Sequence, residues 1–118
     1  MGDVWKKMEV APVNEGVQNI FAWEFQENLI ASGNGAWIII PDEVAGVAVT
    51  VSFASGGTGK VQTTTDKVAF VKAGSSVVVK DWDLGTVSGT TQDYCKPCTA
   101  IRAVQIASGT MQITVRAQ

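Results

Sequence analysis

The stretch Val47-Ala48-Val49-Thr50-Val51-Ser52-Phe53 decides the fold class, because its large apolar residues occupy every second position. Side chains of a β-strand alternate between two faces, so this pattern predicts a strand with one buried face and one polar face. The segment 110–117 alternates in the same way. Composition agrees, since the chain has 17 Val, 8 Ile and 11 Thr against only 2 Leu, and β-branched residues favour sheets.

Turns rich in Gly, Ser and Asn separate the apolar runs, and many short strands with regular turn signals are typical of a sandwich or barrel. The last two predicted strands should form a closing hairpin across Ser108-Gly109. Trp37-Ile38-Ile39-Ile40 is apolar on both faces, which indicates a central strand covered on both sides and ended by Pro41. The predicted strands cover residues 18–26, 36–41, 46–54, 60–64, 67–72, 76–80, 86–91, 100–107 and 110–117.

A chain of 118 residues and 12.5 kDa is long enough for one domain. We therefore predict an all-β protein, an antiparallel β-sandwich of jelly-roll or Ig-like topology over residues 18–118, with a closed barrel as the alternative. Residues 1–17 show no clear period and predict an extended N-terminal arm. We expect this arm to be dispensable for folding and to lie across neighbouring chains.

Charge and residue usage exclude several classes of function. The chain carries 9 Lys and Arg against 11 Asp and Glu, and it has no basic run of the kind that nucleic-acid binding needs. It has no histidine, so the Ser-His-Asp and Cys-His devices of hydrolases are impossible within one chain. No secretory signal or membrane-length apolar stretch is visible, which predicts synthesis in the cytoplasm and no membrane partner.

Two short motifs, a glycine-rich segment and a Cys-x-x-Cys segment, could be structural loops or chemical sites. Ser55-Gly56-Gly57-Thr58-Gly59-Lys60 looks like a phosphate loop, but Val61 stands where that motif needs Ser or Thr and a strand follows instead of a helix. We interpret it as a glycine-rich hairpin loop. Cys95-Lys96-Pro97-Cys98 could be a structural loop, with thiols that are reduced in the cytosol or joined in a local disulfide after lysis into air. It could also be half of a zinc site shared between subunits, or a redox pair.

The segment Asp81-Trp82-Asp83 puts two carboxylates on one face of an extended chain, an arrangement that acid/base chemistry or calcium could use. No third acidic residue lies near in sequence, and Trp82 is interpreted as a core or edge plug. We therefore predict no catalytic residue, no cofactor and no metal ligand, and no enzymatic activity.

The residues that we predict at a partner interface are large apolar or cationic side chains outside the obvious core. Trp5 stands in the polar N-terminal segment, where either a neighbouring subunit or its own domain could bury it. Arg102 and Arg116 stand among apolar residues of predicted strands and can be solvated, paired or interface anchors. The full set of predicted interface residues is Val4, Trp5, Met8, Arg102 and Arg116.

The last two-thirds of the chain, from about residue 42 to 118, resembles a known class of proteins. The shared features are Gly57-Thr58-Gly59-Lys60-Val61-Gln62, a Trp before a turn at Trp82-Asp83-Leu84-Gly85, and Thr99-Ala100-Ile101-Arg102, followed by Ser108-Gly109-Thr110. These segments resemble small β-sandwich virion proteins of tailed bacteriophages, the class that includes head decoration, or cement, proteins. The Cys95/Cys98 pair is not part of that pattern, and the first thirty residues match nothing in it.

The resemblance implies a structural protein of the virion. We expect a capsid decoration protein that binds the lattice of the major capsid protein and stabilises it, as a homo-oligomer. The alternatives are a neck, tail or fibre component that contacts other virion proteins, or a small carbohydrate- or metal-binding β module.

Overall fold

The computed structural model describes residues 5–12, 21–42, 44, 46–54, 56–95, 98–107 and 109–117. Its strands are β1 (Trp5–Lys7), β2 (Glu9–Pro12), β3 (Phe21–Leu29), β4 (Gly33–Asn34), β5 (Trp37–Ile39), β6 (Val47–Ala54), β7 (Gly59–Thr64), β8 (Lys80–Asp81), β9 (Thr91–Cys95), β10 (Ala100–Gln105) and β11 (Thr110–Ala117). The single helix in these ranges is α1 (Val68–Lys72). The prediction of an all-β fold is confirmed.

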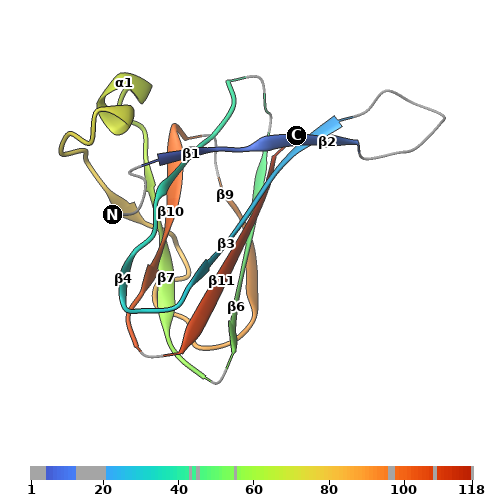
Figure 1. Cartoon of the computed structure of the whole chain (residues 1–118), viewed down its shortest axis with the longest axis vertical. Helices are drawn as coiled ribbons and strands as arrows, with labels where there is room; N and C mark the ends of the chain where they lie inside the picture. Colours follow the sequence, from blue (N-terminus) through green and yellow to red (C-terminus); the bar gives the residue numbers. More distant parts are fainter. Residues whose placement is uncertain are drawn as a thin grey trace.

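The strands form two sheets that pack face to face (Figure 1). Sheet A has the order β1-β5-β10-β7-β8, with β4 also pairing to β10, and sheet B has the order β2-β3-β11-β6-β9. All pairings are antiparallel except that of β1 with β5. Without the N-terminal strands, the central orders β5-β10-β7-β8 and β3-β11-β6-β9 are those of a jelly roll, in which most connections cross between the sheets.

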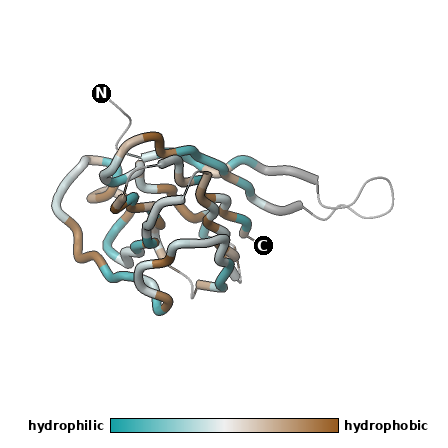
Figure 2. Tube along the Cα trace, turned by 90° about the horizontal axis from the view of Figure 1, so that it is seen from below, coloured by the Kyte–Doolittle hydropathy of each residue, from teal (hydrophilic) through white to brown (hydrophobic). Residues whose placement is uncertain are grey.

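The alternation read in the sequence appears directly in the burial of β6 and β11. Val47, Val49 and Val51 are at most 1% exposed, and they lie beside the buried Ala117, Val115 and Ile113 of β11. The residues between them point to the outer face of sheet B. Figure 2 shows apolar and polar stretches interspersed along the chain throughout the body. Burying one face of each sheet against the other is what makes this pattern stable.

The prediction of a closing hairpin between the last two strands is wrong. β10 belongs to sheet A and β11 to sheet B, so the chain crosses from one layer to the other between Gln105 and Thr110. The glycine-rich loop after β6 also crosses between sheets and is not a hairpin loop. In β10 and β11, and likewise in β6 and β7, both strands bury an apolar face toward the same core. The sequence pattern of two such strands is the same whether they form a hairpin within one sheet or lie in opposite sheets.

The predicted strand over 67–72 is also wrong, because this segment contains α1. The spacing of Val68 and Val71 suits one helix face as well as a buried strand. Backbone N–H groups of Ala73 and Ser75 donate to the carbonyls of Ala69 and Phe70, and Gly74 has a φ of 74°, which favours glycine and ends the helix.

Strand positions shift in three further places, and the first predicted strand, 18–26, lies at Phe21–Leu29. Of the predicted strand 76–80, only Lys80 pairs in β8, while residues 76–79 belong to no helix or strand. The strand predicted at 86–91 lies at Thr91–Cys95, and Val87 contributes only an isolated bridge to Gly59.

The N-terminal segment closes one side of the sandwich. β1 lies at the edge of sheet A and β2 lies at the edge of sheet B, and Met8 between them is 4% exposed in the main core (Figure 1). β2 also pairs with Phe21 and Ala22 of β3, beyond the point where β11 ends its pairing at Trp23. Residues 5–12 of the predicted arm are therefore integral strands, and we expect the sandwich to need them for normal folding. Residues 1–4 and 13–17 of that arm lie outside the described residues.

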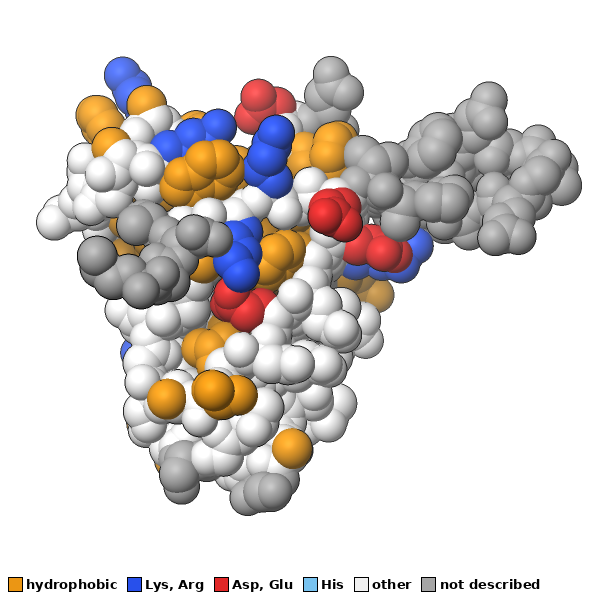
Figure 3. Space-filling model, viewed as in Figure 1, with side chains coloured by type: hydrophobic (Ala, Val, Ile, Leu, Met, Phe, Trp, Pro, Cys, Tyr) orange, Lys and Arg blue, Asp and Glu red, His pale blue; other side chains and the backbone are white. Residues whose placement is uncertain are grey.

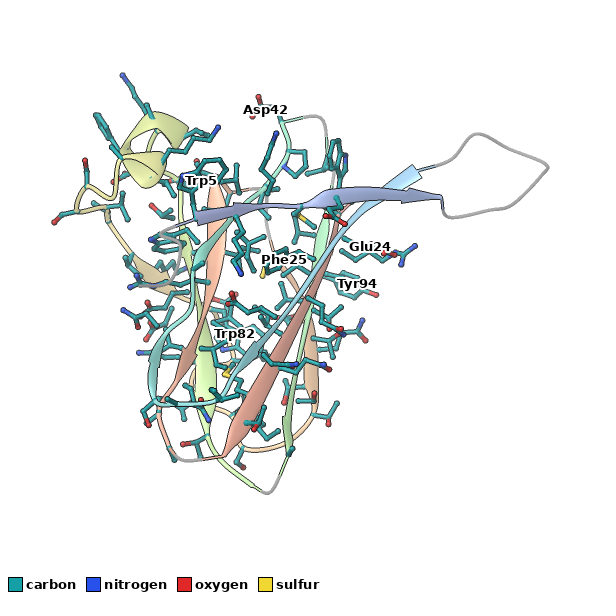
Figure 4. The ribbon with its side chains drawn as sticks, viewed as in Figure 1. Trp5, Glu24, Phe25, Asp42, Trp82 and Tyr94 are labelled. Atoms are coloured by element: carbon teal, nitrogen blue, oxygen red, sulfur yellow. The ribbon has the colours of Figure 1, made fainter. Side chains whose placement is uncertain are left out.

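Trp82 closes the opposite side. It follows β8, the far edge of sheet A, and it is 5% exposed within the main core. Its indole N–H donates to the carbonyl of Gly85 at 2.6 Å, which satisfies the one polar group that the ring buries. Figure 4 shows Trp82 between the two sheets, as the interpretation of a core plug predicted.

Candidate functional site

The outer face of sheet A carries a row of interacting side chains that crosses the whole sheet. The strand register places Trp5 beside Trp37, Arg102 beside Gln62, and Gln62 beside Asp81. β5 and β10 pair at Ile38 and Ile101, so the next position of this antiparallel ladder brings Trp37 beside Arg102. We call these five residues, Trp5, Trp37, Arg102, Gln62 and Asp81, the cross-strand row.

Arg102 is held rigidly at the centre of the row. Its guanidinium carbon lies 4.4 Å from the centroid of the Trp37 ring, and its Nε donates to Gln62 Oε1 at 2.9 Å. Burial lowers the pKa of the Arg102 guanidinium, but an arginine stays protonated at any physiological pH. A stacked guanidinium fixed at Nε presents its terminal N–H groups in one defined direction.

The row ends on β8 in a carboxylate that is tied from two sides. Gln62 Nε2 donates to Asp81 Oδ1 at 2.9 Å, and Lys60 Nζ lies 3.0 Å from Asp81 Oδ2. The hydrogen bond from Gln62 and then the bond from Lys60 lower the pKa of Asp81 below the ordinary value of 3.8. The amide of Gln62 thus connects a cation on one side to an anion on the other and fixes the orientation of both.

The other end of the row is covered by the segment that contains α1. Trp37 forms a second apolar cluster with Val71 of α1 and Ala100, and Trp5 packs against it with Val77. Lys72 Nζ lies 4.6 Å from the centroid of the Trp5 ring, a cation–π contact. The segment 37–40 was predicted to be a strand that is covered on both faces. This cover over the outer face confirms that prediction.

The predicted interface residues divide between the two sheets. Trp5 and Arg102 come together in the cross-strand row, with Trp5 half-buried on its own domain. Met8 belongs to the core and offers no surface to a partner. Arg116 lies on the outer face of sheet B, where its Nη1 is 2.7 Å from Glu24 Oε1. Val4 lies outside the described residues.

The sequence did not identify Trp37, Gln62 and Asp81 as members of one site, since they come from three separate strands. The alternation of Lys60 and Gln62 with buried Val61 was a usable signal that both point to the outer face. The register that aligns them with Arg102 and Asp81 depends on the crossing connections, which the sequence pattern did not define.

The two cysteines lie where the chain passes from β9 of sheet B to β10 of sheet A, and both side chains pack against the main core. Burial, and then the charges of Asp93 and Asp83, raise the pKa of the Cys95 thiol. Burial, and then the neighbouring Cys95, raise the pKa of Cys98 to about 12. Thiols of high pKa are poor nucleophiles at neutral pH, which favours the structural interpretation over the redox one.

The remaining motifs make no composite site in the part of the chain that the structure describes. Asp83 lies 3.7 Å from Lys80, so the two carboxylates around Trp82 are held by different lysines. No three Asp, Glu or Cys side chains of the described ranges meet in a group that could hold a metal ion. Within the same ranges, no helix has the length and apolar character of a bilayer span.

Comparisons with family models, curated proteins and solved structures gave no match to this chain.

Proposed function

We propose that the chain is a structural protein of a bacteriophage particle, a capsid decoration protein that binds the major capsid protein lattice as a homo-oligomer and stabilises it. The observation that carries the proposal is the jelly-roll order of the two sheets together with the rigid row of aromatic and charged side chains on one outer face. Eight-stranded jelly rolls serve in viral capsid, lectin and cupin domains. The sequence resemblance to phage virion proteins is our reason for proposing the first of these.

The arrangement of the described residues suits binding better than turnover. Cupin metal sites are built around histidine, which this sequence lacks. A lectin would offer an exposed aromatic platform in a groove, but Trp82 is buried and Trp37 is covered by Arg102 and α1. The cross-strand row instead resembles the anchors of protein interfaces, where Trp and Arg side chains are enriched.

The proposed mechanism is mechanical. A sandwich whose sides are closed by Met8 and Trp82 is a rigid body, so it loses little conformational entropy on docking. Binding to the mature lattice alone stabilises that lattice by mass action, and many weak contacts on a repeating surface add avidity. No covalent step is required.

Copy number in purified virions tests the proposal. Particles of the phage that encodes the chain are purified on a density gradient, and the chain is quantified by mass spectrometry against the major capsid protein. Hundreds of copies per particle are expected for a head decoration protein. A few dozen or fewer would replace it with a neck, tail or fibre component, and absence from the particle would refute a virion role.

Rebinding to particles that lack the chain tests the surface. Arg102→Gln removes the centre of the cross-strand row, and we expect it to weaken co-sedimentation with such particles. Arg116→Gln removes a cation of the same type from sheet B and is the matched control. Equal loss in both variants would show that the row is not the contact surface.

A further inference from the structure

A groove of about 1060 Å³ runs along the edge of sheet A, and Arg102 lines it. One wall is formed by residues 33–37 of β4 and β5, and the other by residues 74–77 after α1. Lys6 and Glu27 lie at the side that faces sheet B, with Lys6 Nζ 3.5 Å from Glu27 Oε2. Figure 3 shows one face of the molecule, on which blue and red side chains lie close together.

The two cations that line the groove are in different states. Lys6 has the carboxylate of Glu27 within 4 Å. Among the described residues, Arg102 has no carboxylate partner, and its only hydrogen bond runs from Nε to Gln62. Its terminal N–H groups therefore stand beside the groove, oriented by Trp37 and Gln62, without an acceptor from the described chain.

The walls are shaped for a main chain. Gly33, with a φ of 131°, has nothing within 4 Å of the position where a Cβ would stand, and Ala36, Gly74 and Ser75 are similarly small. A glycine in a strand, such as Gly33 in β4, can mark a place where another backbone approaches closely. Among the described residues, no strand pairs with β4 on the side away from β10, because β1 meets β5 only from Trp37 onward.

We infer that this groove binds an extended segment of a partner protein, laid along residues 33–36 as an added strand, with a Glu or Asp carboxylate of that segment on the terminal N–H groups of Arg102. Strand addition supplies main-chain hydrogen bonds, and a side-chain pocket supplies the specificity. A fixed guanidinium fork matches a carboxylate in a bidentate manner. A nucleic acid is disfavoured, because the other cation that lines the groove, Lys6, is already paired with Glu27 and the chain carries a net charge of -2.

The inference depends on the proposed function only for the origin of the segment, which would be another virion protein. The particle experiments above and the peptide experiment below can therefore fail independently. A chain absent from virions could still bind acidic peptides, and a virion protein could dock without using this groove.

The test is a titration of the full-length ¹⁵N-labelled chain with two capped peptides, Ac-Thr-Val-Glu-Val-Thr-NH2 and its Gln analogue, followed by heteronuclear NMR. We expect the Glu peptide to shift the amide resonances of residues 33–36 and the Nε–H resonance of Arg102. The Gln peptide should bind at least about tenfold more weakly, the loss expected for hydrogen bonds to a charged group.

Variants identify the residue responsible. Arg102→Gln should remove the preference for Glu over Gln, Arg102→Lys should keep part of it, and the control Arg116→Gln should keep all of it. The NMR spectrum of each variant reports whether it is folded, and Arg102→Lys retains the charge if Arg102→Gln unfolds. Equal binding of both peptides, or an unchanged preference in Arg102→Gln, would overturn the inference.

The chain's own first four residues directly precede β1 and are the competing occupant. If the full-length chain shows no shifts and a variant without residues 1–4 does, the groove belongs to the chain itself and partner docking is refuted. If neither protein responds to the Glu peptide, the inference fails as well.

Discussion

The outer faces of the two sheets have opposite character. Sheet A carries the cross-strand row and is partly covered by α1, so that Trp37 is only 6% exposed. Sheet B has no such cover over its described residues, and its outer face is built from short polar side chains such as Gln26, Thr114 and Thr50. Tyr94 on β9 is 76% exposed, and Figure 4 shows Tyr94 and Glu24 pointing away from the body.

The difference shows that the specific side-chain contacts of the outer surface are concentrated on sheet A. The inner faces of both sheets follow one rule, alternate apolar burial, and would do so in any sandwich. The outer face of sheet B needs only to be soluble, and its Gln26–Thr114 hydrogen bond and Arg116–Glu24 ion pair are ordinary surface contacts. The row on sheet A aligns residues from five strands, which solubility does not require.

The largest expected effect of an outer-face substitution is that of Trp37→Ala on sheet A. It empties the second apolar cluster and removes the ring under Arg102, so we expect a loss of about 3–5 kcal/mol in the free energy of unfolding. Tyr94→Ala on sheet B should change it by less than about 0.5 kcal/mol, because the ring is largely solvated. Urea denaturation measures both, and similar losses would remove the distinction between the faces.

Met8→Ala tests whether the N-terminal segment belongs to both sheets. Because Met8 is buried where the chain passes from β1 to β2, we expect a loss of about 2–5 kcal/mol. The neighbouring Lys7 is exposed, and Lys7→Ala is the control with an expected change below about 0.5 kcal/mol. A Met8→Ala protein as stable as wild type would restore the view of a dispensable arm.

Gly35→Ala probes the contact between the edge of sheet A and β3 of sheet B. A Cβ at Gly35 would lie 2.7 Å from Glu27 Oε1 and 3.3 Å from the carbonyl oxygen of Ala103, so we expect a loss of about 1–3 kcal/mol. Adding Glu27→Ala should recover part of this loss in a double-mutant cycle. Gly46→Ala, with open space around its Cβ position, should be neutral; strict additivity of the Gly35 and Glu27 changes would contradict the contact.

The smallest effect is the pH dependence that Asp81 contributes. Its pKa is lowered in the folded chain, so near and below pH 3.8 the unfolded chain binds more protons. The stabilisation is fully present above the unfolded pKa and is lost as the pH falls through the lower folded pKa. An NMR titration of the Asp81 carboxyl should show this low pKa, and Gln62→Leu with Lys60→Gln should raise it. An unchanged pKa in that variant would mean that the end of the row is not formed in solution.

The sequence predicted what depends on local alternation and missed what depends on which layers the strands join. Val47 to Phe53 and Met111 to Val115 were enough for the class of fold, because burial with a period of two is characteristic of a strand with one face in the core. The hairpin at Ser108-Gly109 failed, because a turn between two half-buried strands looks the same within a sheet and across sheets. The segment 67–72 failed, because five residues are too few to separate a helical period from a strand.

The candidate site was predictable only in part, for the same reason. Trp5 and Arg102 stood out as large side chains without an obvious place in the core. Nothing local linked them to Gln62 or Asp81, since residues 40 and 19 positions apart become neighbours only through the register of β10, β7 and β8. Met8 was predicted at the surface because the sequence around it has no hydrophobic period. In the structure it is buried because the strands on either side of it, β1 and β2, belong to different sheets.

The orientation of the chain on an intact phage particle, seen by electron cryomicroscopy, is the decisive test of the proposed decoration role. We expect density for the sandwich on the outside of the capsid, with α1 and the cross-strand row of sheet A toward the shell and the polar face of sheet B toward solvent. Density with sheet B against the shell would contradict the cross-strand row as the contact surface, and particles on which the chain is absent would contradict the decoration role itself.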